Sequence, residues 1–194
     1  MEQRTDGWYS ERCGKVTASC IAKVMAKLRD GSPGADRKIY LAQLVTERLT
    51  GLPTQGFTNA AMEWGIETEA QARAMYELDH GVAVVEVGFV PHPTIEMTGA
   101  SPDGLVGDDG LVEIKCPNTA THIETLRRGG IDRKYLLQMH WQMICTQREW
   151  CDYVSFDPRL PIEMQLHVQR VPRDAELCEE ITAEVTTFLA EVNQ

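Results

Sequence analysis

The chain of 194 residues lacks the marks of a secreted, membrane-spanning or cysteine-stapled protein. Its six cysteines include no Cys-x-x-Cys pair, which excludes a zinc ribbon and a dithiol redox site. Its five histidines have no ligand spacing, so zinc is not indicated. No stretch is long and apolar enough to span a bilayer, and the polar start Met1-Glu-Gln-Arg-Thr-Asp6 differs from a signal peptide. We therefore expect a protein of a reducing cytoplasm without membrane contact.

Basic residues are also scarce, since 19 Lys and Arg stand against 29 Asp and Glu, a net charge of −10. The imbalance is uneven along the chain. Residues 1–48 carry nine basic and six acidic side chains (net +3) and residues 115–149 carry six and three (net +3), whereas 49–114 carry one and eleven (net −10) and 150–194 three and nine (net −6). A broad basic face is therefore excluded. A polyanion could be held only in a confined groove that draws on the two positive segments.

The pattern of apolar residues predicts one domain over residues 1–194, because 43% hydrophobic residues suffice for a core. Helical spacing or strand-like alternation, bounded by Gly, Pro and capping residues, marks each element. The expected helices cover 17–28 (capped by Thr17 or Ser19), 37–50, 58–80 (capped by Thr58 or Asn59), 119–128, 133–147 and 174–192, and the expected strands cover 82–90, 95–100, 102–106, 111–115, 149–156 and 164–171. Helices thus flank a central run of strands, so we expect an α/β (α+β) fold with a central mixed sheet.

The segment 101–117 combines a turn with a group of charged side chains. A stretch rich in Gly and Asp lies between two apolar stretches and predicts a hairpin. On the second strand Glu113 and Lys115 are two residues apart and share a face, while Ile114 points into the core. Asp103 on the first strand can reach that same face. We therefore expect two carboxylates and an ammonium to converge there.

Such a group fits a divalent cation. Mg²⁺ prefers oxygen ligands, typically one or two carboxylates with waters and phosphate oxygens. Asp103 and Glu113 supply the carboxylates, and the backbone carbonyl of Ile114 supplies a third oxygen. Lys115 beside the metal can orient an attacking water or stabilise charge on a phosphoryl oxygen, and the cation should depress the pKa of this lysine. The alternative is an exposed hairpin whose surface Glu–Lys pair contributes little to stability.

The same residues carry a resemblance to a known family. Ser101-Pro-Asp-Gly104 followed by Glu113-Ile-Lys-Cys-Pro117 resembles the phage lambda-type (viral recombination, alkaline) exonuclease family, part of the PD-(D/E)xK nuclease superfamily. Four further segments are similar to motifs of that family, in its order: Trp8-Tyr-Ser-Glu-Arg-Cys-Gly-Lys-Val-Thr-Ala-Ser19, Met62-Glu-Trp-Gly-Ile-Glu-Thr-Glu69, Tyr135-Leu-Leu-Gln-Met-His140 and Phe156-Asp-Pro-Arg159. The resemblance implies a restriction-endonuclease-like core.

The resemblance also implies a pocket for a DNA 5′-phosphate. Arg12 would be the main ligand, because a guanidinium matches a phosphate with two parallel hydrogen bonds. Thr17, Ser19 and Ser101 would add hydroxyl groups or helix-end amides. Thr17 and Ser19 are equally well explained as helix caps.

Three positions on the expected helices are assigned by the resemblance. Glu69 would lie in the metal shell, where the pattern alone indicates only a solvated helix residue. Gln138 would lie near Lys115 or the scissile phosphate, although a structural bond to the backbone is the alternative. His140 stands where the family has a second glutamine, and we expect a packed or exposed histidine. Further candidates for contact with the DNA backbone are Lys15, Arg37, Lys38, Arg127, Arg128, Arg133 and Lys134.

The implied activity is a Mg²⁺- or Mn²⁺-dependent exonuclease with two bound ions, which digests double-stranded DNA from 5′-phosphorylated ends and leaves a 3′ single strand. The resemblance further implies a homotrimeric ring threaded by DNA and a single-strand annealing protein as partner, in the cytoplasm of a bacterium that carries the phage or prophage. Two alternatives stay open. One is an endonuclease of the same superfamily, which would nick closed circles. The other is a non-catalytic DNA-end-binding module, against which the intact Asp103, Glu113 and Lys115 argue.

Overall fold

A computed structural model describes residues 3–54 and 60–194. Its strands are β1 (Val16–Thr17), β2 (Val84–Val85), β3 (Val90–Pro91), β4 (Thr98–Ala100), β5 (Gly104–Val106), β6 (Gly110–Lys115), β7 (Trp150–Phe156) and β8 (Leu166–Pro172). Its helices are α1 (Asp6–Arg12), α2 (Ile21–Val24), α3 (Ala35–Thr50), α4 (Ala60–His80), α5 (Thr119–Arg128), α6 (Arg133–Thr146) and α7 (Ala175–Val192), with short 3₁₀ turns η1 (Ala18–Cys20) and η2 (Ile162–Met164).

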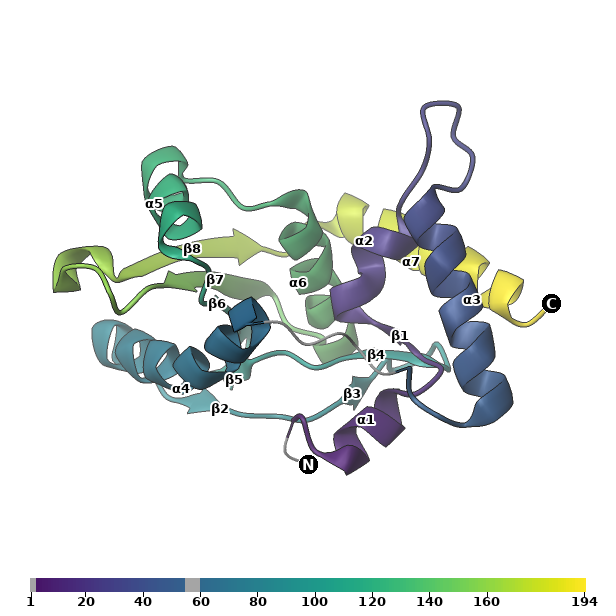
Figure 1. The fold of residues 1–194 in the computed structure, drawn as a ribbon, viewed down its shortest axis with the longest axis horizontal. Coiled ribbons are helices and arrows are strands. Elements are labelled where there is room, and N and C mark those ends of the chain that lie inside the picture. Colours follow the sequence, from purple (N-terminus) through teal and green to yellow (C-terminus); the bar gives the residue numbers. More distant parts are fainter. Residues whose placement is uncertain (1–2, 55–59) are drawn as a thin grey trace.

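The strands form two sheets, with orders β2–β5–β6–β7–β8 and β1–β4–β3 (Figure 1). The larger sheet is mixed, because β6 and β7 run parallel while the other neighbours run antiparallel. The crossover between β6 and β7 contains α5 and α6, as a parallel pair requires. The α/β fold with a central mixed sheet and flanking helices, predicted from the sequence, is confirmed.

The predicted hairpin is formed by β5 and β6, with Gly104 opposite Val112. The chain reverses after Gly107, whose φ of +53° suits glycine because it has no Cβ. On the next strand Tyr153 lies opposite Glu113, so the acid-bearing face of β6 continues onto β7.

Helices cover both faces of the larger sheet. Ala72 and Tyr76 of α4 pack with Val112 and Val154 on one face. Met139 and Met143 of α6 pack on the opposite face. The sheet therefore has α4 on one face and α6 on the other, with β6 as its middle strand.

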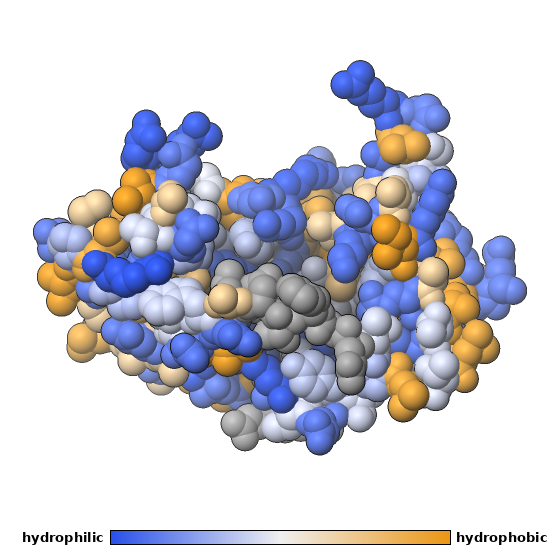
Figure 2. Space-filling view, in the orientation of Figure 1, coloured by the Kyte–Doolittle hydropathy of each residue, from blue (hydrophilic) through white to orange (hydrophobic). Residues whose placement is uncertain are grey.

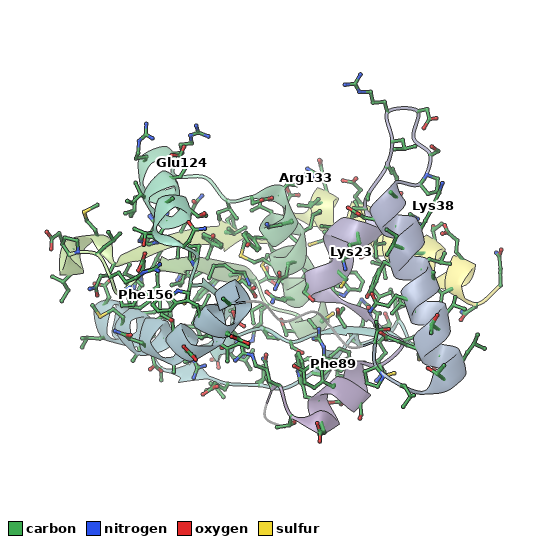
Figure 3. The ribbon with its side chains drawn as sticks, in the orientation of Figure 1. Lys23, Lys38, Phe89, Glu124, Arg133 and Phe156 are labelled. Carbon is green, nitrogen blue, oxygen red and sulfur yellow. The ribbon has the colours of Figure 1, made fainter. Side chains whose placement is uncertain are left out.

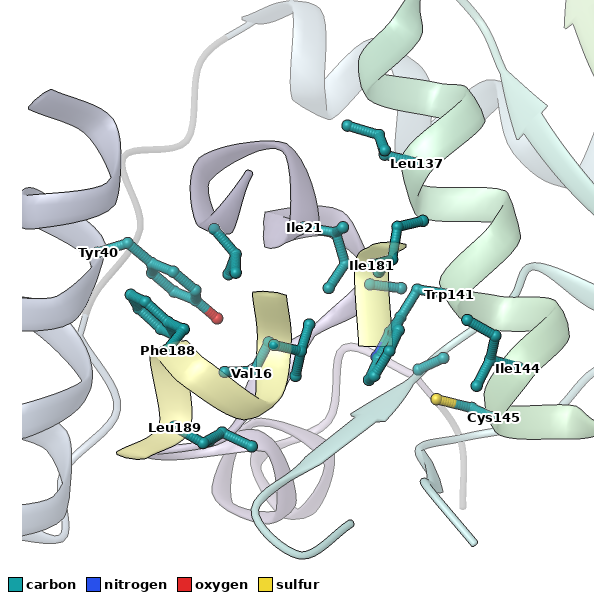
Figure 4. Packing of buried hydrophobic residues seen from close by; sticks show 14 of the residues in the cluster. Val16, Ile21, Tyr40, Leu137, Trp141, Ile144, Cys145, Ile181, Phe188 and Leu189 are labelled. Atoms are coloured by element: carbon teal, nitrogen blue, oxygen red, sulfur yellow. The ribbon is translucent and has the colours of Figure 1, made fainter. Parts of the chain in front are cut away.

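A second core lies between α2, α3, α6 and α7 beside the small sheet (Figure 4). Tyr40 and Phe188 stack with ring centroids 5.5 Å apart, and Trp141 and Ile181 are fully buried. Because Trp141 belongs to α6, this core and the larger sheet share one helix. That shared helix holds the N-terminal elements in a defined position against the hairpin.

Several expected boundaries agree with the structure, and others are wrong. The helix expected over 17–28 is only η1 and α2, and neither Thr17 nor Ser19 caps it with its side chain. The strand expected over 82–90 is confined to β2 and the start of β3. Helix α1 was not expected at all. The caps expected at Thr58 or Asn59 lie outside the described residues.

Between α2 and α3 the chain projects as an arm of residues 25–34, whose sides meet at a bridge between Lys27 and Pro33. Hydrophilic side chains crowd the tip of this arm and the end of α5, while apolar side chains show along α3 (Figure 2). No helix within residues 3–54 and 60–194 combines the length and the apolar character that crossing a membrane requires.

Candidate active site

Glu113 is the centre of the candidate site. Glu113 lies on β6, the second strand of the hairpin, and is only 1% exposed. Its Oε1 accepts hydrogen bonds from Lys115 Nζ and, at 2.6 Å, from Gln138 Nε2. Its Oε2 accepts from Gln142 Nε2 at 2.6 Å. The expected pairing of Glu113 with Lys115 is therefore present, with Glu113 buried and held by α6, and not as the exposed surface pair of the alternative.

Asp103 joins this group from the residue just before β5. Its Oδ2 accepts a hydrogen bond of 2.7 Å from the backbone N–H of Ile114. The N–H and C=O groups of one strand residue point toward the same neighbouring strand. The carbonyl of Ile114 is therefore directed to the side of the strand on which Asp103 lies, as a third oxygen ligand would have to be. The Ile114 side chain is 4% exposed and belongs to the core, as predicted.

The charges of neighbouring side chains shift the pKa of Asp103 and the pKa of Lys115. Burial raises the pKa of Asp103 well above its usual range, and the charges of Glu113 and Glu69 raise it further. For Lys115, burial alone would lower the pKa, but Glu113 and Asp103 outweigh burial and raise the pKa above its ordinary value. Acids that repel one another in a buried site favour a cation between them.

Glu69 reaches the site from α4, on the other side of the sheet. Its side chain is 14% exposed and pairs with Arg4 and with Arg73, the latter at 3.5 Å. Arg4 is held nearby because the neighbouring Gln3 donates hydrogen bonds to the backbone carbonyls of Val87 (2.9 Å) and Pro102 (2.8 Å). Glu69 is thus close enough to Asp103 to affect its pKa, and its charge is met by two arginines that sequence reasoning did not assign.

A divalent cation needs several oxygen donors that converge on one point. Among residues 3–54 and 60–194, no three His, Cys, Asp or Glu side chains converge closely enough to enclose a metal ion. Mg²⁺ does not require such a cage, because one or two carboxylates with waters and phosphate oxygens commonly suffice. Asp103, Glu113 and the Ile114 carbonyl are oxygen donors of the type that Mg²⁺ prefers, and the hydrogen bond from the Ile114 N–H places Asp103 beside that residue.

A second polar group lies two residues before Asp103. Ser101 Oγ accepts hydrogen bonds from Arg12 Nη1 and from Trp8 Nε1, both at 3.0 Å. The Arg12 guanidinium stacks over the Trp8 ring, 4.1 Å from its centroid. Burial lowers the pKa of Arg12. A guanidinium nevertheless stays charged in proteins, so a positive charge is held beside Ser101. The predicted partners Arg12 and Ser101 are therefore brought together.

The other two predicted phosphate ligands are placed differently from each other. Thr17 is buried and, with Arg12, lines a cavity of about 200 Å³. Ser19 is exposed, and its Oγ lies 3.4 Å from Thr17 Oγ1. Thr17 therefore lines the same cavity as Arg12, whereas Ser19 is exposed beside Thr17 and is not among the residues that line this cavity.

The structure also corrects one candidate for DNA contact and locates others. Arg37 is 4% exposed and pairs with Glu184 and Glu191, so the prediction that it contacts the DNA backbone is wrong. Lys38 and Arg133 are exposed, on α3 and at the start of α6 (Figure 3). Of the two states expected for His140, packed or exposed, the structure shows the packed one: it is 3% exposed, and its Nδ1 bonds to Leu136 O at 2.7 Å.

Two residues beside the site were missed. Gln142 bonds Glu113 directly, and the Tyr135 ring lies 5.1 Å from Lys115 Nζ. Gln142 could have been found from its spacing, since it is one helical turn after Gln138 and therefore on the same side of the helix. Tyr135 belongs to the segment Tyr135-Leu-Leu-Gln-Met-His140 that resembles a family motif, but the motif alone does not predict its contact with Lys115.

The mixed sheet with this acid–acid–lysine group is a restriction-endonuclease-like core. The chain belongs to the family of YqaJ-like viral recombinase domains, which it matches over residues 7–149. The chain is also similar to LHK-Exo, an alkaline exonuclease from Laribacter hongkongensis, of which there are two crystal structures, one of them in complex with dAMP. The identity is 53% and the TM-score is 0.91, over 97% of this chain and 93% of that chain. The resemblance inferred from the motifs is confirmed.

A more distant likeness concerns the fold alone. A phage-related exonuclease from Haemophilus somnus 129PT is 17% identical, with a TM-score of 0.73 over 93% of this chain and 94% of that chain. Among curated proteins, none matches the sequence.

Proposed function

We propose that this chain is a Mg²⁺-dependent exodeoxyribonuclease that digests double-stranded DNA in the 5′-to-3′ direction from 5′-phosphorylated ends, leaving a 3′ single strand. The observation that carries the proposal is the adjacency of two groups: the Asp103–Glu113–Lys115 group, in which Glu113 is buried, and, two residues before Asp103, the Arg12–Ser101 pair. The 53% identity to an alkaline exonuclease supports the same activity.

Asp103, Glu113 and the Ile114 carbonyl would hold the metal, with Glu69 contributing from α4. When bound, two Mg²⁺ or Mn²⁺ ions would supply Lewis acidity to the scissile phosphate and to the attacking and leaving oxygens. Lys115, no longer needed to neutralise Glu113, would orient the attacking water or stabilise charge on the phosphoryl oxygen. Gln138 would keep Glu113 in place during this exchange.

The Arg12–Ser101 pair would set the direction of digestion. A guanidinium and a hydroxyl that already share a hydrogen bond can both turn to a terminal phosphate, whose three oxygens accept several donors. Thr17 and Ser19 would complete the pocket. Because Ser101 is only two residues from Asp103, a 5′-terminal phosphate held there would lie near the bond to be hydrolysed.

The assembly we propose is a homotrimeric ring around DNA. Leu49 (82% exposed) and Leu52 (69%) lie at or just after the C-terminal end of α3, whereas Leu78 (80%) lies near the C-terminal end of α4 and Ile162 (70%) in η2. Helices α3 and α4 lie on opposite sides of the molecule (Figure 1). Two separate apolar areas at opposite ends suit a head-to-tail contact that closes into a ring. A ring also explains how an acidic chain holds DNA, because only the channel lining must be positive.

The proposed setting is phage recombination in the bacterial cytoplasm, with a single-strand annealing protein as partner. That partner would receive the 3′ strand that digestion exposes.

The test is digestion of an end-labelled linear duplex with and without Mg²⁺, beside a covalently closed circle of the same DNA. We expect Mg²⁺-dependent release of nucleotides from 5′ ends and an intact circle. Nicking of the circle would replace the proposal with an endonuclease. Absence of digestion, with DNA ends still bound, would leave a non-catalytic end-binding module.

A further inference from the structure

Gln142 is a buried glutamine whose amide is only half satisfied. The residue is 0% exposed and lies in the C-terminal half of α6, next to Trp141 and Met143. Its Nε2 donates to Glu113 Oε2 at 2.6 Å, whereas its Oε1 has no hydrogen-bond partner among the residues that the structure describes. A buried polar atom without a partner is costly and calls for an explanation.

The orientation of the amide follows from its partner. An ionised carboxylate can only accept hydrogen bonds, so the NH₂ group and not the carbonyl oxygen of Gln142 must face Glu113. Gln138, one turn earlier on the same helix, meets the other oxygen in the same way. The two amides therefore hold one carboxylate, with one amide on each oxygen.

These contacts differ in kind from the contact with Lys115. A lysine neutralises Glu113 and so competes with a metal ion for its charge. The two glutamines are neutral donors, which fix the plane of the carboxylate while its negative charge stays available. Each carboxylate oxygen has more than one lone-pair direction, so a bond from an amide leaves room for a cation.

We propose that Gln142 is a positioning residue for the divalent-metal site: it fixes Glu113 so that the carboxylate is ready for the cation when Lys115 turns away. This inference rests on the metal dependence in the proposed function. A glutamine that served packing alone would gain nothing from an orientation that leaves its own carbonyl unpaired. Outer groups that orient metal ligands commonly change metal affinity by 10–100-fold when removed.

The experiment measures Mn²⁺ binding to the protein without DNA, by electron paramagnetic resonance of the free ion. Gln142→Leu removes the amide and keeps the size of the side chain. His140→Leu is the matched control, because His140 is also buried on α6 but forms its hydrogen bond with Leu136 O, one turn earlier on the same helix. We expect Gln142→Leu to weaken Mn²⁺ binding about tenfold and His140→Leu to leave it unchanged. The Mg²⁺ concentration for half-maximal digestion should shift with the same factor.

Each outcome bears on a different statement. Mn²⁺ affinity of folded Gln142→Leu within about twofold of the wild-type value would overturn the role of Gln142, given the 10–100-fold change expected otherwise. If Gln142→Leu does not fold, Gln142→Asn decides by the same criterion, because its shorter side chain withdraws the amide from Glu113. If the wild-type protein binds no Mn²⁺, or Glu113→Gln binds it equally well, the metal-dependent function itself fails.

Discussion

Replacing Arg12 by alanine tests the most specific part of the proposed function, the recognition of a 5′-phosphate. The guanidinium stacks on Trp8 and donates to Ser101, so its removal takes one positive charge from the pocket. Ser101 keeps its hydrogen bond from Trp8, and the pocket should retain its shape. Any loss should therefore concern the phosphate and not the fold.

The size of the effect follows from the surroundings of Arg12. Because Arg12 is partly buried, which lowers its pKa, its hydrogen bonds to a phosphate would be less screened than those of an arginine on the open surface. A hydrogen bond to a charged group contributes about 1.5–3 kcal/mol. Losing one or two of them costs about 3 kcal/mol, which is roughly a 100-fold loss in kcat/KM on 5′-phosphorylated ends.

The assay compares initial digestion rates on linear duplexes that differ only in a 5′-phosphate or a 5′-hydroxyl. Wild-type protein should prefer the phosphate, and Arg12→Ala should digest both ends at the slower rate. Arg133→Ala is the matched control, since it removes an exposed arginine far from Ser101 along the chain and should lower both rates equally. A preference for phosphate that persists in Arg12→Ala would refute the assignment of this pocket.

Lys115→Ala should lower kcat by about 10²–10³ while end binding in a gel-shift assay persists; unchanged Mg²⁺-dependent digestion would contradict the assignment. Asp103→Asn should raise the melting temperature at pH 7 in EDTA and abolish metal binding. Burial and the charge of Glu113 raise the pKa of Asp103 in the folded protein above its pKa in the unfolded chain. At a pH between these two pKa values the folded protein keeps a proton that the unfolded chain has lost, so the stability falls as pH rises through that range. A melting temperature of Asp103→Asn equal to or lower than that of the wild-type protein would refute this. The side chain of Arg159 lowers the Asp157 pKa to about 2, so this pair stabilises the fold above about pH 4 and less as pH falls toward 2. In Asp157→Asn the free energy of unfolding, measured with urea, should depend less on pH in that range than in the wild-type protein. An unchanged dependence on pH would exclude the Asp157–Arg159 pair as the cause.

Local pattern was sufficient for the hairpin and its acids. Residues two apart on a strand share a face, so Glu113 and Lys115 had to meet wherever the strand packed. The helices at 119–128 and 133–147 were also predictable, since each starts at a capping residue, Asn118 and Asp132, and carries apolar residues at helical spacing. The roles of Arg12 and Glu69 came from motif resemblance, because a lone arginine or glutamate on a helix carries no local signal.

Local pattern failed where distant contacts decide the conformation. The β-rich stretch 82–90 forms only β2 and the start of β3, because a strand needs a partner and the neighbours of this stretch belong to two different sheets. The apolar spacing over 17–28 predicted one helix, but Val16 and Thr17 pair with β4, some 80 residues away in sequence, and the helix begins later. Pairing of that kind has no signal in a short window.

The sequence by itself determined the fold class and the Asp103–Glu113–Lys115 group, since both depend on periodicities that act within one element or one hairpin. The tertiary structure alone decided that Glu113 is buried and held by Gln142, and that Arg12 meets Ser101. These contacts join segments 29 and 89 residues apart. The physical reason is that periodicity sets which residues share a face, whereas the packing of α6 and α1 on the sheets sets what that face meets.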